Sequence, residues 1–507
     1  MNIIKFINLL KPCIFMYYGP NHGKGMKVLI INAPLSLAEQ AGNSSLAKVG
    51  NLQQPLGILY IAAVLEKEGF DVVVFDCPQL DITMPELRDL VAKEKPALIG
   101  YSCTTLSFNN TVKSAKLIKE AVPDTTIILG GPHVAADPKG CLDNDIFDVA
   151  ITGEAEYAFL EIAELLKDGK YDREHYTDVK GLLYKDKGPK GEHMVKFTPS
   201  RGFINNLDEL PFPARHLVAP LPEYKATIAS SMRHPVGSLM SSRGCPAQCK
   251  FCDRSVFGNR FRAHSAERLV DECELLIKKH GAREIKFWDD TFTLNQARIK
   301  KMCDLIAERK LDFVWTCLTR VDASTPELFK MMKKAGCWQV LFGIEHGNDE
   351  MLKKMKKGTN SAMIRKAVGW AKDAGLNVRG SFVVGFPGET SETMEENLVF
   401  AKSLPLDVAS FYVFTPYHGT EAFHDLVVQG KIKHNDYDHY HEMIDPDSAK
   451  LAYVPDGMTE KEIKVFMSKC YKEFFLRPSY IWGQIKGIRH MNQVLGYVEG
   501  LRAVVGL

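Results

Sequence analysis

The chain has 507 residues, of which 45% are hydrophobic and 25% are charged, and its formal net charge is +2. This composition is typical of a globular protein, and the length predicts about three domains. A charge so close to zero gives no electrostatic reason to expect a nucleic-acid partner, and no sequence run reaches the roughly 18–20 apolar residues of a membrane span. The twelve cysteines lack a secretory signal or an even spacing, so we expect a cytoplasmic protein with metal ligation rather than disulfides.

Short apolar segments alternate with helical periodicity over residues 26–170, after an apolar and basic stretch (1–25) that we expect to be a loose extension. Strands are predicted at 27–33, 71–76, 97–102, 125–131 and 148–153, and helices at 56–69, 84–94, 109–122 and 154–167. Continuously apolar strands between helices are typical of a parallel sheet with both faces covered. The sequence therefore predicts an α/β, doubly wound, Rossmann-like domain that binds its ligand beyond the carboxyl ends of the strands.

A second strand–helix series occupies residues 233–430, after a polar and proline-rich stretch (171–232) that is predicted to be a linker. Its strands are predicted at 236–241, 284–288, 313–318, 339–345, 378–385 and 408–414, and its helices at 266–280, 295–309, 325–335, 360–375 and 391–403. Six such units predict a partial (β/α)6 barrel of the TIM type, with its active site at the carboxyl ends of the strands. Residues 431–507 are predicted to be mainly helical.

Three cysteines follow the first predicted barrel strand in the sequence SSRGCPAQCKFCD. Cys245, Cys249 and Cys252 have the spacing C-x3-C-x2-C, and thiolates are the usual ligands of iron–sulfur clusters. Three thiolates leave one iron of a [4Fe–4S] cluster open, as a catalytic metal site requires. A zinc knuckle is the alternative, and it is disfavoured because zinc sites usually have four ligands and paired C-x2-C spacings.

This motif, with Phe251 before the last cysteine, resembles that of the radical S-adenosylmethionine (SAM) superfamily. The resemblance implies that the three cysteines are catalytic, that the open iron binds the amino and carboxylate groups of SAM, and that an electron from a donor such as ferredoxin or flavodoxin cleaves SAM to a 5′-deoxyadenosyl radical. Glu345 is expected to bind the ribose, and the segment 380–390 to approach adenine. The residues implied in SAM binding are Phe251, Asp289, Asp290, Arg320, Glu345, Gly380, Gly385 and Pro416. Trp288–Asp289–Asp290 departs from the family's Gly-Gly-Glu-like segment.

The first predicted domain resembles that of the cobalamin-binding group within this superfamily. The matching residues include Pro55, Leu56, Gly57, Ser102, Thr105, Gly130, Gly131, His133, Gly153 and Glu154. The motif Asp-x-His-x-x-Gly is absent, so the sequence offers no lower cobalt ligand through it. His133 is expected to approach the corrin, with a buried or capping histidine as an equal alternative. A Rossmann-like domain that binds a nucleotide or nothing is the other interpretation, although no G-x-G-x-x-G follows the first strand.

The resemblance therefore implies a cobalamin-dependent radical SAM methyltransferase that acts on an unactivated carbon of a small-molecule or lipid substrate. A carbon radical would accept a methyl group from methylcobalamin, and a second SAM would remethylate the cobalt. An oxidative cyclase similar to the anaerobic Mg-protoporphyrin cyclases, and a non-catalytic cobalamin or cluster sensor, are the alternatives.

Two features of the C-terminal region have more than one interpretation. His434, Asp436, Asp438, His439, His441 and Glu442 predict a solvated loop or lid, with a second metal site as the lesser alternative. Residues 480–507 have an apolar helical stripe and basic residues. Packing of this helix against the barrel is favoured over peripheral contact with a membrane.

Overall fold

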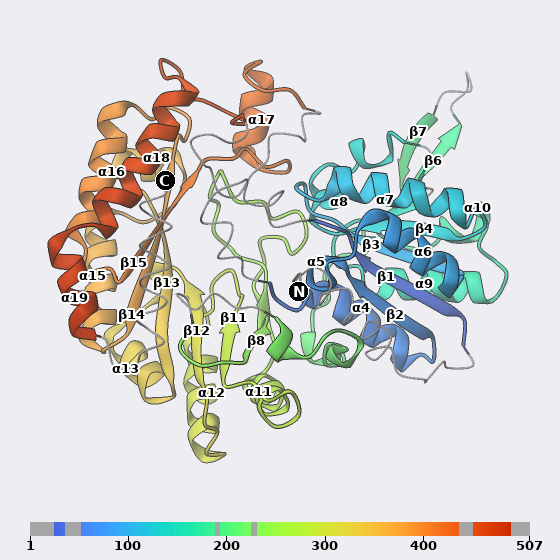
Figure 1. The fold of residues 1–507 in the computed structure, drawn as a ribbon, viewed down its shortest axis with the longest axis horizontal. Helices are drawn as coiled ribbons and strands as arrows, with labels where there is room; N and C mark the ends of the chain where they lie inside the picture. Colours follow the sequence, from blue (N-terminus) through green and yellow to red (C-terminus); the bar gives the residue numbers. More distant parts are fainter. Residues whose placement is uncertain are drawn as a thin grey trace, which may run out of the picture. The chain divides into compact units, whose positions relative to one another are not determined.

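The computed structural model describes residues 25–35, 52–144, 146–147, 149–187, 193–224, 231–434 and 450–487 (Figure 1). The chain divides into two compact units. The first comprises Met1–Ser36, Gln54–Ile204 and Glu209–Glu223, and the second comprises Leu37–Gln53, Asn205–Asp208 and Tyr224–Leu507. The predictions for residues 1–24, 435–449 and 488–507 lie outside the described residues.

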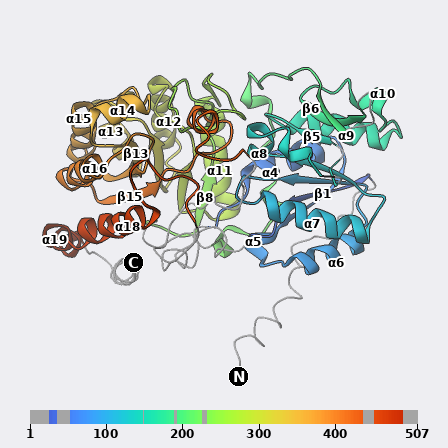
Figure 2. The same ribbon diagram turned by 90° about the horizontal axis from the view of Figure 1, so that it is seen from above.

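The first unit is built on a seven-stranded sheet with the order β2-β1-β3-β4-β5-β6-β7. Strands β1 to β5 run parallel, and β6 and β7 are antiparallel to their neighbours. All six positions of β2 are buried, because helices cover both faces of the sheet; α6 and α7 lie together on one face (Figure 2). The predicted doubly wound α/β domain is confirmed. Its elements are β1 (Lys27–Asn32), α4 (Leu56–Lys67), β2 (Asp71–Asp76), α5 (Cys77–Leu80), α6 (Met84–Glu94), β3 (Leu98–Ser102), α7 (Phe108–Ala121), β4 (Thr126–Gly130), α8 (Pro132–Ala136), β5 (Val149–Ile151), α9 (Glu156–Lys167), α10 (Arg173–Tyr176), β6 (Leu182–Lys187) and β7 (His193–Phe197).

The segment 171–232 is more than the linker that the sequence predicted. It contains α10 and the strands β6 and β7, which extend the first sheet, and β6 pairs with β5. These strands were missed because lysine and aspartate interrupt their apolar positions, as is common near the edge of a sheet. Two hydrogen bonds connect later residues of the segment to the first unit. The Glu154 carboxylate accepts from the Ile204 N–H at 2.7 Å, and Arg215 Nη1 donates to Gln54 Oε1 at 3.0 Å.

The second unit is built on six parallel strands with the order β15-β14-β13-β12-β11-β8. Among the described residues, the two end strands do not pair with each other, so the sheet is an open, partial barrel, as predicted. The strands are β8 (Val236–Leu239), β11 (Glu284–Phe287), β12 (Val314–Thr319), β13 (Cys337–Glu345), β14 (Asn377–Val384) and β15 (Val408–Val413). The helices are α11 (Ala266–His280), α12 (Gln296–Glu308), α13 (Pro326–Lys334), α14 (Asp349–Lys354), α15 (Ser361–Asp373), α16 (Ser391–Ser403), α17 (Glu421–Val428), α18 (Glu460–Phe475) and α19 (Pro478–Gly487).

The outer face of this sheet is apolar and packs on helices, so the other face lines the interior of the barrel. Phe342 lies 5.9 Å from Phe329 of α13, and Phe411 lies 5.7 Å from Tyr471 of α18, measured between ring centroids. A Cβ atom on Gly237 of β8 would lie 3.3 Å from the Leu276 side chain of α11. Because neighbouring residues of a strand point to opposite faces, the residues between these positions face inward.

The described residues after Met458 form the helices α18 and α19, in agreement with the predicted helical character of this region. Helix α17, directly after the last strand, and the short α14 were not predicted. No described helix has the length and apolar character needed to cross a membrane. The apolar stripe predicted over 480–507 begins in α19, and its continuation lies outside the described residues.

Candidate active site at the barrel mouth

The three cysteines lie on one loop (residues 244–261, the cysteine loop) that follows the first barrel strand. Two short antiparallel strands, β9 (Ser242–Arg243) and β10 (Arg262–Ala263), close its base. Gly244 begins the loop with a φ of +82°, and a Cβ atom there would overlap the carbonyl oxygen of Arg260. The middle of the loop is also fixed, because Lys250 N donates to the Met355 carbonyl and Lys250 O accepts from Ala422 N, each at 3.0 Å.

Asp289, which follows β11, holds the start of the cysteine loop. Its Oδ1 accepts a hydrogen bond from Ser241 N at 2.7 Å, and its Oδ2 accepts from the hydroxyls of Ser241 and Ser242 at 2.5 and 2.6 Å. The Arg298 guanidinium lies 3.7 Å from Oδ2 and balances the buried charge. In the structure both oxygens of Asp289 hold the start of the cysteine loop, so this residue positions the loop. The predicted contact of Asp289 with SAM stays a prediction.

The cysteine sulfurs have polar neighbours from other strand ends. Cys245 Sγ lies 3.6 Å from the Thr291 hydroxyl. Cys252 is exposed, and partial loss of solvation, followed by the negative charges of Asp290, Cys249 and Cys245, raises its pKa. The three sulfurs are therefore close enough to oppose one another's ionisation. Bound metal cations would relieve that repulsion, so the donor set fits a metal cluster.

Arg320, at the end of β12, points its guanidinium at the second cysteine. Its Nη1 lies 3.6 Å from Cys249 Sγ. The orientation is fixed because Nε and Nη2 donate to the Asp322 carboxylate at 2.9 and 2.7 Å, and Nη2 also donates to the Lys357 carbonyl at 2.7 Å. A guanidinium fixed in this way donates to the thiolate and keeps a positive charge beside it.

A buried ion pair lies at the end of β13. Glu345 Oε1 accepts a hydrogen bond from Lys357 Nζ at 2.9 Å, and the Lys357 ammonium lies 5.9 Å from the centroid of the Phe251 ring. Glu345 has a φ of +69°, which is uncommon for a residue other than glycine. A Cβ atom on Gly343 would overlap Glu345 Oε1, so a glycine there makes room for the pair. The predicted contact of Glu345 with a ribose stays a prediction.

His346 and Glu389 join the ends of β13 and β14, and sequence reasoning selected neither residue. His346 Nδ1 accepts from Asn348 N at 2.9 Å, so the proton is on Nε2, which donates to Glu389 Oε1 at 2.8 Å. The other Glu389 oxygen accepts from the N–H groups of Gly385 and Phe386. Gly385 has a φ of +84° and forms the turn that this carboxylate holds. The Gly-Phe-Pro-Gly-Glu sequence after the strand was the available signal.

The remaining predicted SAM residues differ in their surroundings. A Cβ atom on Gly380 would point to the outer face and lie 2.7 Å from the Ile344 side chain, so close packing requires a glycine here. The predicted approach of this segment to adenine stays a prediction. Pro416 is buried, two residues after the buried Phe414. The pKa of Asp290 is raised by loss of solvation and by the neighbouring Asp289 charge.

In the first unit, the predicted cofactor residues gather at the carboxyl edge of the sheet. Ser102 at the end of β3 is in register with Gly130 at the end of β4, and both are partly exposed, as is Gly153 after β5. The N-terminus of α4 begins with Pro55, Leu56 and Gly57. Gly57 is exposed, and a Cβ atom on it would meet nothing within 4 Å. This glycine-rich edge leaves the backbone open to a ligand.

Three other predicted cofactor residues serve the packing of this edge. Gly131 has a φ of +100°, and a Cβ atom on it would lie 2.7 Å from the backbone of Cys103. His133 is completely buried, its Nδ1 lies 3.0 Å from the Thr105 hydroxyl, and its ring lies 4.4 Å from that of Phe108. The structure therefore favours the buried-histidine interpretation over contact of His133 with a corrin. The Glu154 carboxylate likewise accepts a hydrogen bond inside the unit, from the Ile204 N–H.

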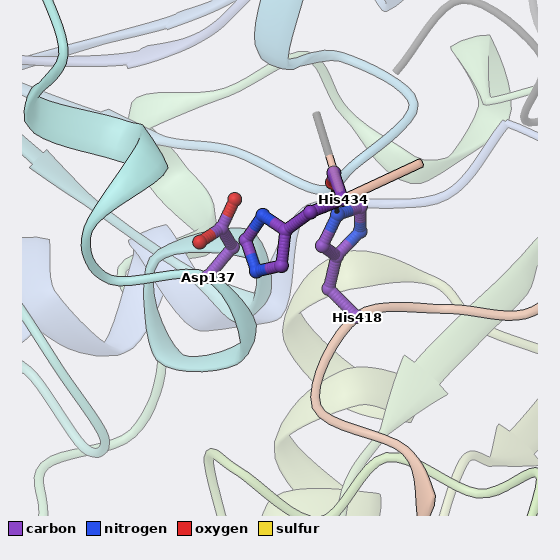
Figure 3. A group of neighbouring side chains, drawn as sticks. All are labelled: Asp137, His418 and His434. Carbon is purple, nitrogen blue, oxygen red and sulfur yellow. Dashed lines mark hydrogen bonds between the residues drawn. The ribbon is translucent and has the colours of Figure 1, made fainter. Parts of the chain in front are cut away.

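A pair of histidines follows the last barrel strand. His418 Nε2 donates to the His434 carbonyl at 2.6 Å, and the two rings meet edge to face at 5.5 Å (Figure 3). Figure 3 also draws Asp137, which belongs to the first unit and accepts a hydrogen bond from Gly140 N there. His418 Nε2 therefore acts as a hydrogen-bond donor and not as a metal ligand. The other residues of the predicted ligand-rich stretch lie outside the described residues.

Comparison with known proteins decides the family. Residues 239–401 match the model of the radical SAM superfamily, and residues 43–163 match that of the B12 binding domain. An uncharacterized methyltransferase of Pyrococcus horikoshii, PH0819, is 34% identical over 460 residues, which are 90% of this chain and 94% of that protein. The chain belongs to the B12-binding radical SAM family.

Two further similarities agree with this membership. The anaerobic magnesium-protoporphyrin IX monomethyl ester cyclase of Rubrivivax gelatinosus is 26% identical over 439 residues, which are 86% of this chain and 76% of the cyclase. The fold matches that of the radical SAM methyltransferase TsrM from Kitasatospora setae with a TM-score of 0.64 and 17% identity, over 87% of this chain and 81% of TsrM. Membership in the B12-binding radical SAM family implies a [4Fe–4S] cluster, SAM and cobalamin as cofactors, and the chain is a radical SAM enzyme.

Replacing Asp289 by alanine tests its role in holding the cysteine loop. The change removes three hydrogen bonds and leaves the Arg298 charge buried, so we expect a loss of about 3 kcal/mol in the free energy of unfolding and reduced iron incorporation. Urea unfolding and iron analysis measure the two effects. The control is Asp271→Ala, which breaks an exposed pair with Arg309 and should cost less than about 1 kcal/mol. Equal stability of the two variants would contradict the assignment.

Replacing Arg320 by glutamine tests the contact with Cys249. A hydrogen bond to a cluster sulfur stabilises the more negative, reduced state, so its loss should lower the reduction potential. A charged hydrogen bond of about 1.5 kcal/mol corresponds to about 60 mV for a one-electron couple. Redox titration followed by electron paramagnetic resonance measures the potential. The exposed Arg88→Gln variant is the control, and an unchanged potential in Arg320→Gln would disprove the role.

Proposed function

We propose that this radical SAM enzyme transfers a methyl group to an unactivated carbon of a small-molecule or lipid substrate, with cobalamin as the methyl carrier. The observation that carries the proposal is that Cys245, Cys249 and Cys252 lie on one loop at the carboxyl ends of the barrel strands. Backbone hydrogen bonds hold this loop in place, and the Arg320 guanidinium lies beside the Cys249 sulfur. The similarity to a relative named as a methyltransferase, over 90% of this chain, supports methyl transfer.

The chain's own residues provide binding and orientation. The three thiolates would hold the cluster, and Asp289 keeps their loop against β11. Arg320 places a fixed positive charge next to Cys249, where a carboxylate of SAM at the open iron would also benefit from it. When bound, the cluster and SAM supply the one-electron chemistry that activates a carbon–hydrogen bond, and cobalamin supplies the methyl group.

The carboxyl edge of the first sheet is our proposed cobalamin site. Ser102, Gly130 and Gly153 are partly exposed along this edge, and Gly57 leaves the start of α4 open. Backbone N–H groups at a helix N-terminus and at glycine-rich strand ends favour the close approach of a large ligand or its phosphate. His133 is not part of this proposal because it is buried.

An oxidative cyclase is the second candidate function. It is supported by the 26% identity to the anaerobic magnesium-protoporphyrin cyclase over 86% of this chain. Both functions use a one-electron donor, such as a ferredoxin or flavodoxin, and the same cysteine loop. They differ in the product, because methylation adds CH2 whereas oxidation adds oxygen or removes hydrogen.

Replacing Cys249 by alanine should abolish cleavage of SAM. The variant loses one of three cluster ligands, so reconstituted protein with a strong reductant should form no 5′-deoxyadenosine above background, measured by chromatography. The control is Cys303→Ala, which removes a buried thiol from α12 and should retain cleavage. Full cleavage by Cys249→Ala would refute the cluster assignment.

Methyl transfer is tested separately in the wild-type protein. Reduced cobalamin and SAM with a labelled methyl group should give S-adenosylhomocysteine and labelled methylcobalamin, because the cobalt must be remethylated in each cycle. SAM cleavage to 5′-deoxyadenosine without S-adenosylhomocysteine would contradict methyl transfer and favour the cyclase.

A further inference from the structure

One residue between the second and third cysteines connects the cysteine loop to α14 and α17, the two helices that the sequence did not predict. Lys250 directly follows Cys249. Lys250 N donates to the carbonyl of Met355 at the C-terminal end of α14, and Lys250 O accepts from Ala422 N in the first turn of α17, each at 3.0 Å. Helix ends leave such groups without a partner inside the helix, so Lys250 supplies one missing partner at each end.

Both of these backbone contacts are made with buried residues. Met355 is 0% exposed and Ala422 is 3% exposed. The Thr420 side chain caps α17 by accepting from Phe423 N, so the N–H of Ala422 has the Lys250 carbonyl as its partner. Breaking either contact would leave a polar backbone group in a poorly solvated place, which costs free energy.

The Lys250 side chain binds the same helix. Its Nζ lies 2.8 Å from Asp425 Oδ2 and 3.1 Å from Glu421 Oε1, and these two acidic residues are neighbours on one face of α17. Lys356, just after α14, donates to both oxygens of Glu421 at 2.7 and 2.8 Å. Lys250, Lys356, Glu421 and Asp425 therefore form one ion-pair network (the Lys250 network), which joins the cysteine loop to both helices.

The next residue of the loop, Phe251, makes apolar contacts on the same side. It packs against an apolar cluster to which α14 and α17 contribute, and its ring meets that of Phe386 edge to face at 6.5 Å between centroids. The buried members of this cluster are Met351, Met355, Phe386, Phe414, Ala422, Leu426 and Tyr453. Apolar burial has no preferred direction, whereas charged hydrogen bonds do, so the Lys250 network fixes where the loop lies on this apolar surface.

The position of Lys250 affects two of the three thiols. Cys252 N donates to the Cys249 carbonyl at 3.2 Å, so Lys250 lies inside the turn that carries both sulfurs. Cys249 is buried and Cys252 is exposed. A shift of Lys250 would therefore change the separation of these sulfurs and open Cys249 to solvent.

We propose that Lys250 is a positioning residue for the iron–sulfur cluster: its ion pairs with Glu421 and Asp425 hold α17 against the cysteine loop and keep the Cys249 and Cys252 sulfurs at the separation that the cluster requires. The inference rests on the proposed function in one respect, because it takes the three cysteines as the cluster ligands. It makes α17, the helix after the last barrel strand, part of the cluster site.

Iron release from the reconstituted, full-length protein to a ferrous chelator tests the proposal under anaerobic conditions. Lys250→Met and the double variant Glu421→Gln, Asp425→Asn should each release iron about fivefold faster than the wild type, since both break the network. Lys250→Arg keeps the charge and the reach, so it should return the rate to within about twofold of the wild type. The matched control is Lys431→Met, because Lys431 follows α17, is similarly exposed and pairs with Asp456 instead. Its rate should equal that of the wild type.

The two halves of the network separate a positioning role from an effect of charge. If charge alone mattered, removing the ammonium and removing the carboxylates would change iron release in opposite directions. Positioning predicts faster release in both. A readout without the cluster is the alkylation of Cys249 by iodoacetamide in the cluster-free, full-length protein, followed by peptide mass spectrometry. Both variants should expose this thiol, which is 6% exposed in the structure, and label it faster.

Wild-type rates of release and labelling in both variants, or changes in opposite directions, would overturn the proposal. Thermal melting verifies that each variant folds, and the double variant decides the test if Lys250→Met does not fold. A wild-type protein that binds no iron would count against the proposed function, and the labelling of Cys249 would still decide whether the Lys250 network positions the loop. The two failures are therefore distinguishable.

Discussion

The carboxylate of Asp289 joins the first two barrel strands at the point where the cysteine loop leaves the sheet, and the geometry of the site depends on it. Its three hydrogen bonds are short and charge-assisted, which makes each of them stronger than a hydrogen bond between neutral groups. Arg298 is buried beside Asp289 and partly neutralises its charge. Removing either charge alone would leave the other uncompensated and lower the free energy of unfolding. A loop that is fixed in this way holds its thiols in position before a cofactor binds, so binding costs little additional conformational entropy.

The other strand ends are joined by a chain of polar contacts that continues around the mouth of the barrel. Arg320 after β12 donates to the backbone of Lys357, whose ammonium pairs with Glu345 at the end of β13. The next residue, His346, donates to Glu389 after β14. Most of these groups are buried, and a charge or dipole held in a poorly solvated place acts more strongly on a ligand than the same group in water. The mouth is therefore a preorganised polar rim at the carboxyl ends of the barrel strands.

Strands, most helices and the three cysteines were predictable because short apolar runs and a fixed cysteine spacing are local signals. Strands β6 and β7 were not, because polar residues hide edge strands. The roles of single residues are hardest to predict: the hydrogen bonds of Asp289 and the close packing at Gly131 and Gly380 leave no trace in the sequence. Lys357 lies in a basic, lysine-rich stretch of sequence, and only the fold shows that it is buried against Glu345. Such roles depend on partners that are distant in the sequence.

Membership in the B12-binding radical SAM family implies that one chain holds both an iron–sulfur cluster and cobalamin. Anaerobic reconstitution with iron, sulfide and hydroxocobalamin, followed by gel filtration, metal analysis and absorption spectra, tests it most directly. We expect about four irons and about one cobalt per chain, with the absorption bands of both cofactors. Iron without cobalt would contradict the methyl-carrier function of the first unit, and cobalt without iron would contradict the assignment of Cys245, Cys249 and Cys252.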